Sequence, residues 1–227
     1  MRGILTALLI LFFYCLGYSQ QLSQVTFKNG STLAYFSFLT DQGILIRLSD
    51  EGKILEWGTE ARSDYYDYYD PKLRPFMGRV EYYGPKDDSI FRGKVKSIGA
   101  CFFTYYDTFQ VKTKIGKLKT IGNQYLDYFE EYENQALKGK IKTIGPVSLD
   151  YYRSYENEAY RGKLKSVGSM PITYYSAFDD RTNSGKLKTV GTIKYSWYSI
   201  GDTPALQGVL KTNNRRASIS GVTYILY

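Results

Sequence analysis

A motif of glycine, lysine, an apolar residue and lysine recurs along the chain, and a pair of aromatic residues follows each copy. The copies read GKVKSIG at Gly93, GKLKTIG at Gly116, GKIKTIG at Gly139, GKLKSVG at Gly162 and GKLKTVG at Gly185. We number each repeat from its first glycine, so the lysines hold positions 2 and 4 and the aromatic pair holds positions 13 and 14. Ammonium groups placed among flat rings can bind an anionic glycan, lipid headgroups or an acidic protein.

The candidate binding residues are both lysines and the second aromatic residue of each copy, which together we call the Lys/Tyr face. They are Lys94, Lys96, Lys117, Lys119, Lys140, Lys142, Lys163, Lys165, Lys186, Lys188, Tyr106, Phe129, Tyr152, Tyr175 and Tyr198. On a sheet that adds two strands per repeat, the rows of lysines recur about every 9 to 10 Å. This regular spacing favours a binding surface for an anionic partner.

Acidic residues recur in the same repeats and offer a simpler interpretation of the lysines. They hold positions 12 and 18 and are Asp127, Asp150, Glu133, Glu156, Asp179 and Asp202. Cross-strand pairs between these carboxylates and the lysines neutralise much of the charge and leave an ordinary solvated sheet surface. We favour this second interpretation, and the sequence alone leaves the anion-binding surface as its alternative.

The composition argues against catalysis and against a bound metal or other cofactor. The chain contains no histidine, the side chain that most often serves as a general base or metal ligand. Adjacent carboxylates such as Glu130 and Glu131 point to opposite faces of a strand and therefore do not converge. In SDYYDYYDP, residues 63–71, carboxylates recur every third residue, whereas a calcium loop uses alternate residues. We interpret that run as an irregular strand.

The period of the repeat, 23 residues, predicts two antiparallel strands of about eight residues joined by short turns. Apolar and aromatic residues at positions 3, 11 and 13 belong on one face of the resulting sheet. We expect the first glycine of each repeat to make room there for the ring at position 13. Position 15 carries Asp107, Glu130 and Arg153, which fit that face only if a β-bulge resets the alternation or if the strand end is solvated.

The repeats fix the domain organisation that we expect. One repeat buries too little apolar surface to fold alone, so the copies must stack and the ends must be capped. We predict a signal peptide over residues 1–19, an N-terminal β cap over 20–58, irregular repeats over 59–92, and five regular repeats over 93–207. A decayed repeat and a capping strand follow over 208–227. The predicted fold class is all-β, an elongated antiparallel β-meander in a single twisted sheet.

The first residues predict export. Arg2 precedes an apolar stretch that is too short to span a membrane, and small residues precede a cleavage point after Ser19. A membrane anchor is the alternative. No other segment is long and apolar enough for a spanning helix. The remaining thiol, Cys101, then has no partner for a disulfide and is expected to be a small buried hydrophobe.

The repeats resemble MORN-type repeats, and in particular a variant whose copies read like YYENGKLKSEG. The resemblance rests on SYENEAYRGKLKSVG and EYENQALKGKIKTIG and covers about residues 93–212. It implies antiparallel hairpins in an elongated, twisted sheet that serves as a scaffold for protein or lipid contact. The chain departs from that pattern where four extra residues interrupt the Asn-Gly turn. It also resembles tyrosine-rich exported repeat proteins of Gram-negative bacteria.

These features together predict a scaffold or binding module of the cell envelope that is not an enzyme. The net charge of +8 favours an anionic envelope component or another protein as the partner, and export makes nucleic acid a poor candidate. The expected location is the periplasm or the cell surface of a Gram-negative bacterium. A small outer-membrane β-barrel is the alternative, because strands alternate and the chain ends on an aromatic residue. Extraction of membranes with salt or alkali separates the two.

Overall fold

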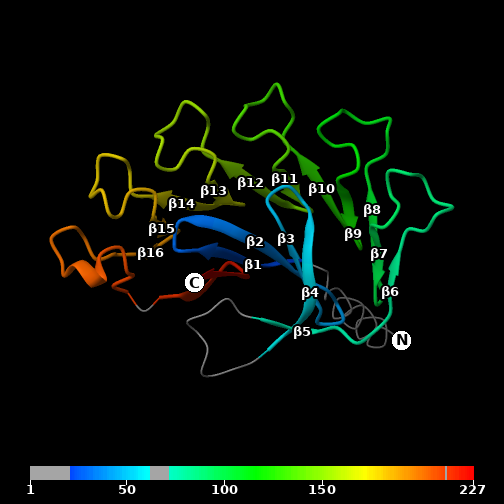
Figure 1. Ribbon diagram of the computed structural model, residues 1–227, viewed down its shortest axis with the longest axis horizontal. Helices are drawn as coiled ribbons and strands as arrows, with labels where there is room; N and C mark the ends of the chain where they lie inside the picture. The colour runs from blue at the N-terminus through cyan, green and yellow to red at the C-terminus, as the bar shows by residue number, and fades with distance from the viewer. Residues whose placement is uncertain (1–20, 62–71, 213) are drawn as a thin grey trace, which may run out of the picture.

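The computed structural model describes residues 21–61, 72–212 and 214–227, and its regular elements are strands apart from one short 3-10 helix, η1 (Pro204–Leu206). Eleven antiparallel strands follow one another in sequence order and form a curved sheet, the repeat sheet (Figure 1). Its strands are β6 (Val80–Tyr82), β7 (Val95–Ile98), β8 (Cys101–Tyr105), β9 (Leu118–Ile121), β10 (Gln124–Tyr128), β11 (Ile141–Ile144), β12 (Val147–Tyr151), β13 (Leu164–Val167), β14 (Met170–Tyr174), β15 (Leu187–Val190) and β16 (Ile193–Lys194). The predicted all-β meander of consecutive antiparallel hairpins is confirmed.

A second sheet of seven strands, the inner sheet, is made from both ends of the described chain. Its order is β17, β18, β1, β2, β3, β4 and β5. These strands are β1 (Gln21–Lys28), β2 (Thr32–Leu39), β3 (Leu45–Leu48), β4 (Ile54–Glu60), β5 (Leu73–Pro75), β17 (Arg216–Ile219) and β18 (Val222–Leu226). β1 and β18 pair in parallel, which joins the first strand to the last. The prediction of one sheet is corrected by this arrangement, because pairing between the chain ends leaves no signal in the local sequence.

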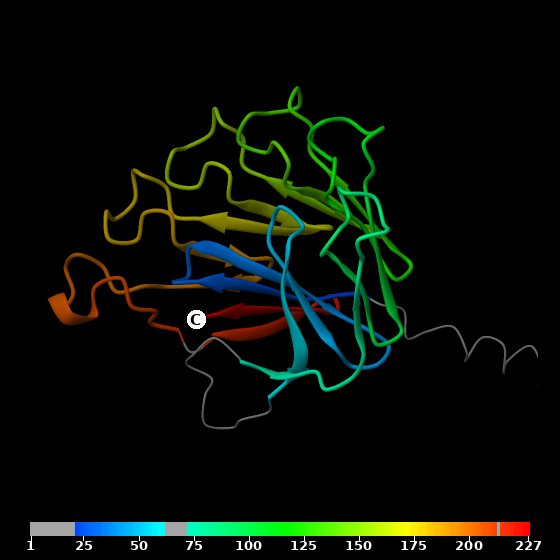
Figure 2. The same ribbon diagram turned by 45° about the vertical axis from the view of Figure 1, so that its right-hand side comes forward.

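The inner sheet lies within the arc of the repeat sheet, as Figures 1 and 2 show from two directions. Residues of both sheets form one core, in which Phe27, Phe36 and Phe38 of the inner sheet pack with the buried residues of the repeats. Side chains at positions 3, 11 and 13 belong to the repeat half of this core, as predicted. Also buried there are the apolar residues at position 6, which are Ile98, Ile121, Ile144, Val167 and Val190. Two sheets that share an apolar interior bury more surface than a single open sheet can.

Two turns of the inner sheet form backbone hydrogen bonds with the repeat sheet, and the two repeats that they contact are two copies apart. The N–H of Ile141 donates to the carbonyl of Asp50 at 2.7 Å, and the N–H of Leu187 donates to the carbonyl of Gly30 at 2.7 Å. Both donors hold position 3 of their repeats. The inner sheet is therefore locked in register with the array by backbone hydrogen bonds as well as by packing.

The strands of each repeat are shorter than predicted, four and five residues in the regular copies β9 to β14. A β-bulge lies between positions 12 and 13, as in the shift between Asp127 and Tyr128 against β11. For position 15 the sequence left both a β-bulge and a solvated strand end open, and the structure places the bulge directly before the aromatic pair. The chain then leaves the sheet after position 14, so position 15 lies in a loop and never meets the apolar face.

The repeat glycine has a different role from the one predicted. Gly93, Gly116, Gly139, Gly162 and Gly185 all have φ between 72° and 76°, a left-handed conformation that glycine adopts without strain. Each returns the chain to the sheet; the N–H of Gly116, for example, donates to the carbonyl of Tyr106 at 2.9 Å. A Cβ built on any of the five meets no aromatic ring. The prediction that these glycines make room for the position-13 ring is wrong.

Rings at position 13 do lie on glycines, but those glycines belong to turns of the inner sheet. A Cβ on Gly52 would overlap the ring of Tyr128, and a Cβ on Gly30 would overlap the ring of Trp197. The close approach of the two sheets therefore requires these two turn glycines.

Three sequence predictions concern other parts of the chain. Cys101 is a free thiol that is fully buried, and burial raises its pKa to about 12, so it is the inert small hydrophobe that we expected. The signal peptide over residues 1–19 and the run over 63–71 lie outside the described residues. Within the described ranges, no helix has the length and apolar character needed to cross a membrane.

Candidate functional site

Lysines at position 2 of the predicted Lys/Tyr face point into the seam between the two sheets. Lys117 donates to the carbonyl of Gly139 at 2.6 Å and Lys163 to that of Gly185 at 2.6 Å, one repeat further on; Lys94 and Lys186 make the same contact with the next glycine. Lys140 instead pairs with the carboxylate of Asp50. The position-2 column therefore ties repeats to each other and to the inner sheet.

These lysines also lie over the position-13 ring of their own repeat, at 4.5 to 5.2 Å from the ring centroid. Burial lowers the pKa of Lys94, Lys117 and Lys186, and lowers that of Lys163 to about 8. The ring face and the glycine carbonyl replace part of the water that each ammonium group loses. A ligand that approaches from solvent therefore finds these cations already engaged.

The hydroxyl groups of the aromatic pair donate to backbone carbonyls, one within the same repeat and the other in the next repeat. At position 13, the hydroxyl of Tyr128 donates to the carbonyl of Leu118 in its own repeat at 2.7 Å. At position 14, the hydroxyl of Tyr106 donates to the carbonyl of Leu126 in the next repeat at 2.7 Å. The same two contacts recur in other copies. The pair YY thus closes one repeat and attaches it to the next.

The position-14 rings of the predicted face are therefore packed within the fold. Tyr106 is 2% exposed and Phe129 is 4% exposed, while Tyr152, Tyr175 and Tyr198 are half-buried. The prediction that these rings stand between rows of lysines on an open surface is corrected, because the loop of each repeat folds over them.

Lysines at position 4 are the outward part of the Lys/Tyr face. Lys96, Lys119, Lys142, Lys165 and Lys188 each lie 5.1 to 5.8 Å from the centroid of the position-14 ring of the preceding repeat. Three of them also meet position-18 carboxylates: Lys142 with Glu133 at 2.7 Å, Lys165 with Glu156 at 3.1 Å and Lys188 with Asp179 at 4.0 Å. This is the charge compensation that the simpler interpretation predicted.

Among the residues that the structure describes, the most exposed aromatic side chains lie at position 17, which was not among the predicted site positions. Phe109 is 92% exposed, Tyr132 82%, Tyr155 82% and Phe178 93%. All four stand in the loops that connect successive hairpins, and these loops form the outer rim of the arc in Figure 1. We call them the rim rings. Their recurrence every 23 residues was visible in the sequence, but their exposure was not.

One turn presents each rim ring. Positions 15 to 18 form a turn in which, for Tyr155, the N–H of Glu156 donates to the carbonyl of Arg153 at 3.2 Å. The carboxylate at position 18 also accepts the N–H of position 15, as Asp179 does from Ser176 at 2.6 Å. That hydrogen bond lowers the pKa of Asp179. The same carboxylate faces the position-4 lysine of the next repeat, so Tyr132, Tyr155 and Phe178 are carried on turns that are fixed to the sheet, whereas position 18 of the Phe109 loop is Gln110.

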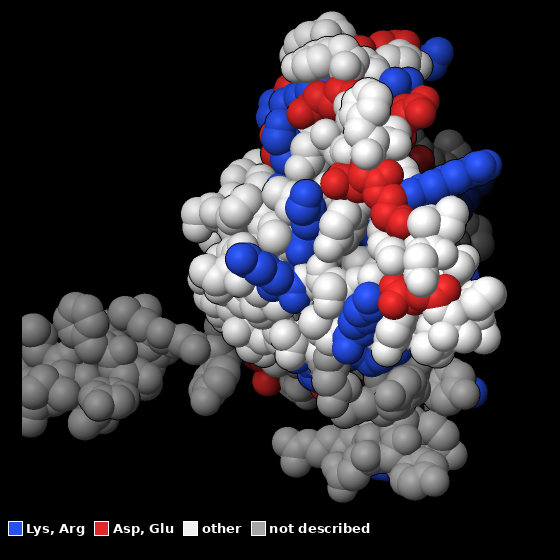
Figure 3. Space-filling model, turned by 90° about the vertical axis from the view of Figure 1, so that its left-hand side faces the viewer, with Lys and Arg blue, Asp and Glu red and all other residues white. Residues whose placement is uncertain are grey.

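The charge on the rim is mixed. Figure 3 shows acidic and basic side chains beside one another on the face that carries the loops of the later repeats. Carboxylates flank the rings directly, with Glu131 and Glu133 on either side of Tyr132 and Asp179 next to Phe178. The rim therefore lacks the single-sign field that attracts a polyanion.

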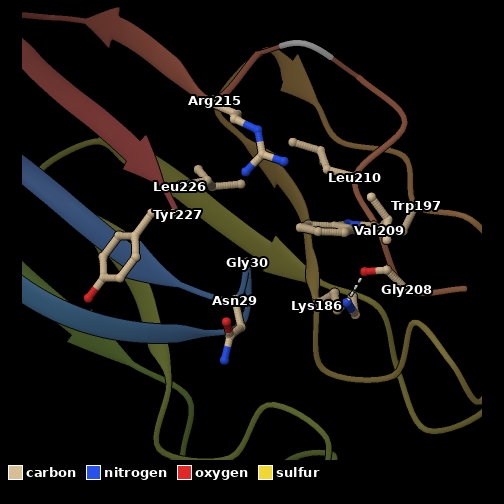
Figure 4. Close-up of a pocket in the computed structure, with 10 residues that line it drawn as sticks. All are labelled: Asn29, Gly30, Lys186, Trp197, Gly208, Val209, Leu210, Arg215, Leu226 and Tyr227. Atoms are coloured by element: carbon tan, nitrogen blue, oxygen red, sulfur yellow. Dashed lines mark hydrogen bonds between the residues drawn. The ribbon is translucent and has the colours of Figure 1, made fainter. Parts of the chain in front are cut away.

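A cavity of about 300 Å³ lies where the last repeat meets the inner sheet (Figure 4). It is lined by Asn29, Gly30, Lys186, Trp197, Gly208, Val209, Leu210, Arg215, Leu226 and Tyr227. The ammonium group of Lys186 lies 4.5 Å from the Trp197 ring centroid and donates to the Gly208 carbonyl. The lining thus combines apolar side chains such as Trp197 and Leu226 with two cations, Arg215 and Lys186, of which Lys186 contacts the Trp197 ring and the Gly208 carbonyl.

Comparison of the chain with protein-family models, curated proteins and solved structures gives no match. The resemblance to MORN-type repeats stays a prediction, and the function must be argued from the geometry of the chain itself.

Proposed function

We propose that this chain is an exported, non-enzymatic scaffold or binding module of the cell envelope of a Gram-negative bacterium, which contacts an extended partner along the rim of the repeat sheet. The observation that carries the proposal is the row of four rim rings, each 82% or more exposed at the same position of its repeat. Large apolar side chains that recur on a protein surface favour an interaction site.

The row favours an extended partner over a compact one. Each repeat adds two strands, so successive rim rings are separated by about 10 Å or more. A partner that repeats along its length can meet several rings at once, and weak contacts then add to a useful affinity. A compact ligand can meet one ring only.

The anionic partner that the lysines suggested receives less support. Position-2 lysines are engaged in the seam, and three of the position-4 lysines face carboxylates at 4.0 Å or less. We therefore assign the lysines chiefly to cohesion of the array and the rim rings to contact.

Sedimentation with isolated envelopes tests the proposal. The chain from residue 20 onward is mixed with envelopes of a Gram-negative bacterium, and we expect it to pellet with them. Replacement of the three rim rings Tyr132, Tyr155 and Phe178 by alanine should release at least about 90% of the bound chain. Lys96→Ser with Lys119→Ser, which changes the Lys/Tyr face at lysines that do not hold these three turns, should release little. A wild-type chain that stays in the supernatant contradicts the proposal, and loss of binding in the lysine variant alone returns the contact to the Lys/Tyr face.

A further inference from the structure

We infer that the rim rings form a binding platform for a linear, uncharged glycan strand. The inference rests on the function proposed above and names the partner of the same surface. Sugar rings in an extended β-linked chain present flat C–H faces at regular intervals, and an exposed aromatic ring stacks on such a face. The spacing of the rim rings is on the scale of a disaccharide unit.

The first support is that the loops are fixed sideways to one another. The side-chain oxygen of Asn134 accepts the N–H of Ser154 at 3.2 Å, and that of Asn157 accepts the N–H of Ala177 at 3.2 Å. In each case the donor is position 16 of the next loop, the residue directly before a rim ring. The position-19 side chain of one repeat therefore holds the turn that presents the next ring.

The outer loops of the row are linked as well. Asp180 accepts the N–H of Ile200 at 3.0 Å in the same way. At the other end, Lys114 of the first regular loop pairs with Asp127 at 2.7 Å and with Glu130 at 3.1 Å. All five loops from residue 107 to residue 207 thus form one chain of contacts, and the distances between rim rings are fixed before any ligand binds. Such preorganisation lowers the entropy that binding costs.

The second support is the balance of charge around the rings. The carboxylates next to the rim rings are paired with lysines: Glu131 with Lys138 at 2.6 Å, Glu133 with Lys142 at 2.7 Å and Asp179 with Lys188 at 4.0 Å. This pairing leaves little net field to attract a polyanion or an anionic membrane surface, where exposed aromatic residues also occur. An uncharged polymer does not depend on such a field.

Soluble chito-oligosaccharides of two, four and six sugars provide the direct test, with binding to the chain from residue 20 onward measured by calorimetry. We expect affinity to rise at least about tenfold from the two-sugar to the six-sugar ligand as a second and third ring become engaged. Because the contact is uncharged, affinity should change less than about twofold when salt is raised from about 0.05 to 0.5 M.

Two variants and a control locate the contact. Tyr132→Ala, Tyr155→Ala and Phe178→Ala combined should reduce six-sugar affinity at least about tenfold. Asn157→Ala, which frees one loop from the next, should weaken six-sugar binding while leaving two-sugar binding unchanged. Met77→Ala, at an apolar residue 92% exposed outside the loops, should bind as the wild type. Thermal unfolding of every variant checks that the fold is intact.

The outcomes separate the inference from the proposed function. No binding to the oligosaccharides, or equal binding by the triple variant, overturns the inference. If the chain still pellets with envelopes in that case, the proposed function stands with a different partner. Binding to vesicles of anionic lipid but not to chito-oligosaccharides replaces the glycan with a membrane surface.

Discussion

The ammonium group of Lys140 forms an ion pair with the carboxylate of Asp50, a residue ninety positions earlier in the chain. Asp50 lies in the turn between β3 and β4 of the inner sheet, and Lys140 directly precedes β11 of the repeat sheet. The backbone N–H of the next residue, Ile141, donates to the Asp50 carbonyl at 2.7 Å. This ion pair shows that a lysine of the repeated motif stabilises the contact between the two sheets and is not free to bind a ligand.

Breaking that pair should loosen the contact between the sheets. In a double-mutant cycle with Lys140→Met and Asp50→Asn, we expect a coupling of about 1 kcal/mol in the free energy of unfolding, because both side chains are about two-thirds or more buried. The control is the pair Lys138 and Glu131 at 2.6 Å, which is more exposed and lies within one loop. A coupling no larger than that of the control pair would show that Lys140 adds nothing to the seam.

Two tyrosines at position 13 allow a matched test of the hydrogen bonds that close each repeat. Tyr128 donates to the Leu118 carbonyl, whereas the equally buried hydroxyl of Tyr151 has no hydrogen-bond partner within the described residues. Tyr128→Phe should lower the free energy of unfolding by about 1 kcal/mol. Tyr151→Phe should be neutral or stabilising, since it removes an unsatisfied polar group. Chemical denaturation measures both, and equal losses would refute the assignment.

Replacing a left-handed glycine by alanine should destabilise the fold through its backbone conformation even where the new methyl group overlaps no other atom. Gly93 has φ of 75°, and no atom lies within 4 Å of the position that a Cβ would take, so Gly93→Ala should cost about 1 kcal/mol from conformation alone. Gly201 lacks a positive φ, and the nearest atom to its Cβ position is 3.9 Å away. We expect Gly201→Ala to change stability by less than about 0.5 kcal/mol. Urea midpoints of the two variants compare them directly.

The buried lysines predict a pH dependence of stability. Lys163 has a pKa of about 8 because it is buried, against about 10.4 in an unfolded chain. Between these values the unfolded chain binds more protons than the folded one, so the contribution of Lys163 to stability rises with pH in that window. Lys163→Met lacks this contribution.

The difference in free energy of unfolding between wild type and Lys163→Met should therefore shift in favour of wild type as pH rises from about 7 to 9.5. Burial raises the pKa of tyrosines such as Tyr128, which destabilises both proteins above about pH 10 and cancels in the difference because Tyr128 belongs to another repeat. A difference that stays constant with pH would mean that the Lys163 ammonium is not penalised by burial.

Much of the repeat could be predicted because its information is local. The 23-residue period, the hairpins and the inward positions 3, 11 and 13 follow from apolar residues that recur in a strand pattern, and the structure confirms each of them. The burial of Cys101 agrees with the expectation from its small apolar side chain. The position-18 carboxylates could be assigned to the lysines from local information as well, since each carboxylate and its lysine are nine residues apart in sequence.

The tertiary structure alone decided which repeated residues face solvent. The inner sheet exists because residues far apart in sequence, such as Val25 and Tyr224, pair side by side, and no local pattern encodes that pairing. Once that sheet fills the arc, the position-2 lysines are enclosed in its seam, and the loops cover the position-14 rings. A repeat pattern specifies that each copy adopts the same local conformation. The burial of a side chain depends in addition on which other parts of the chain pack beside it. The rim rings remained exposed because their turns point away from both sheets.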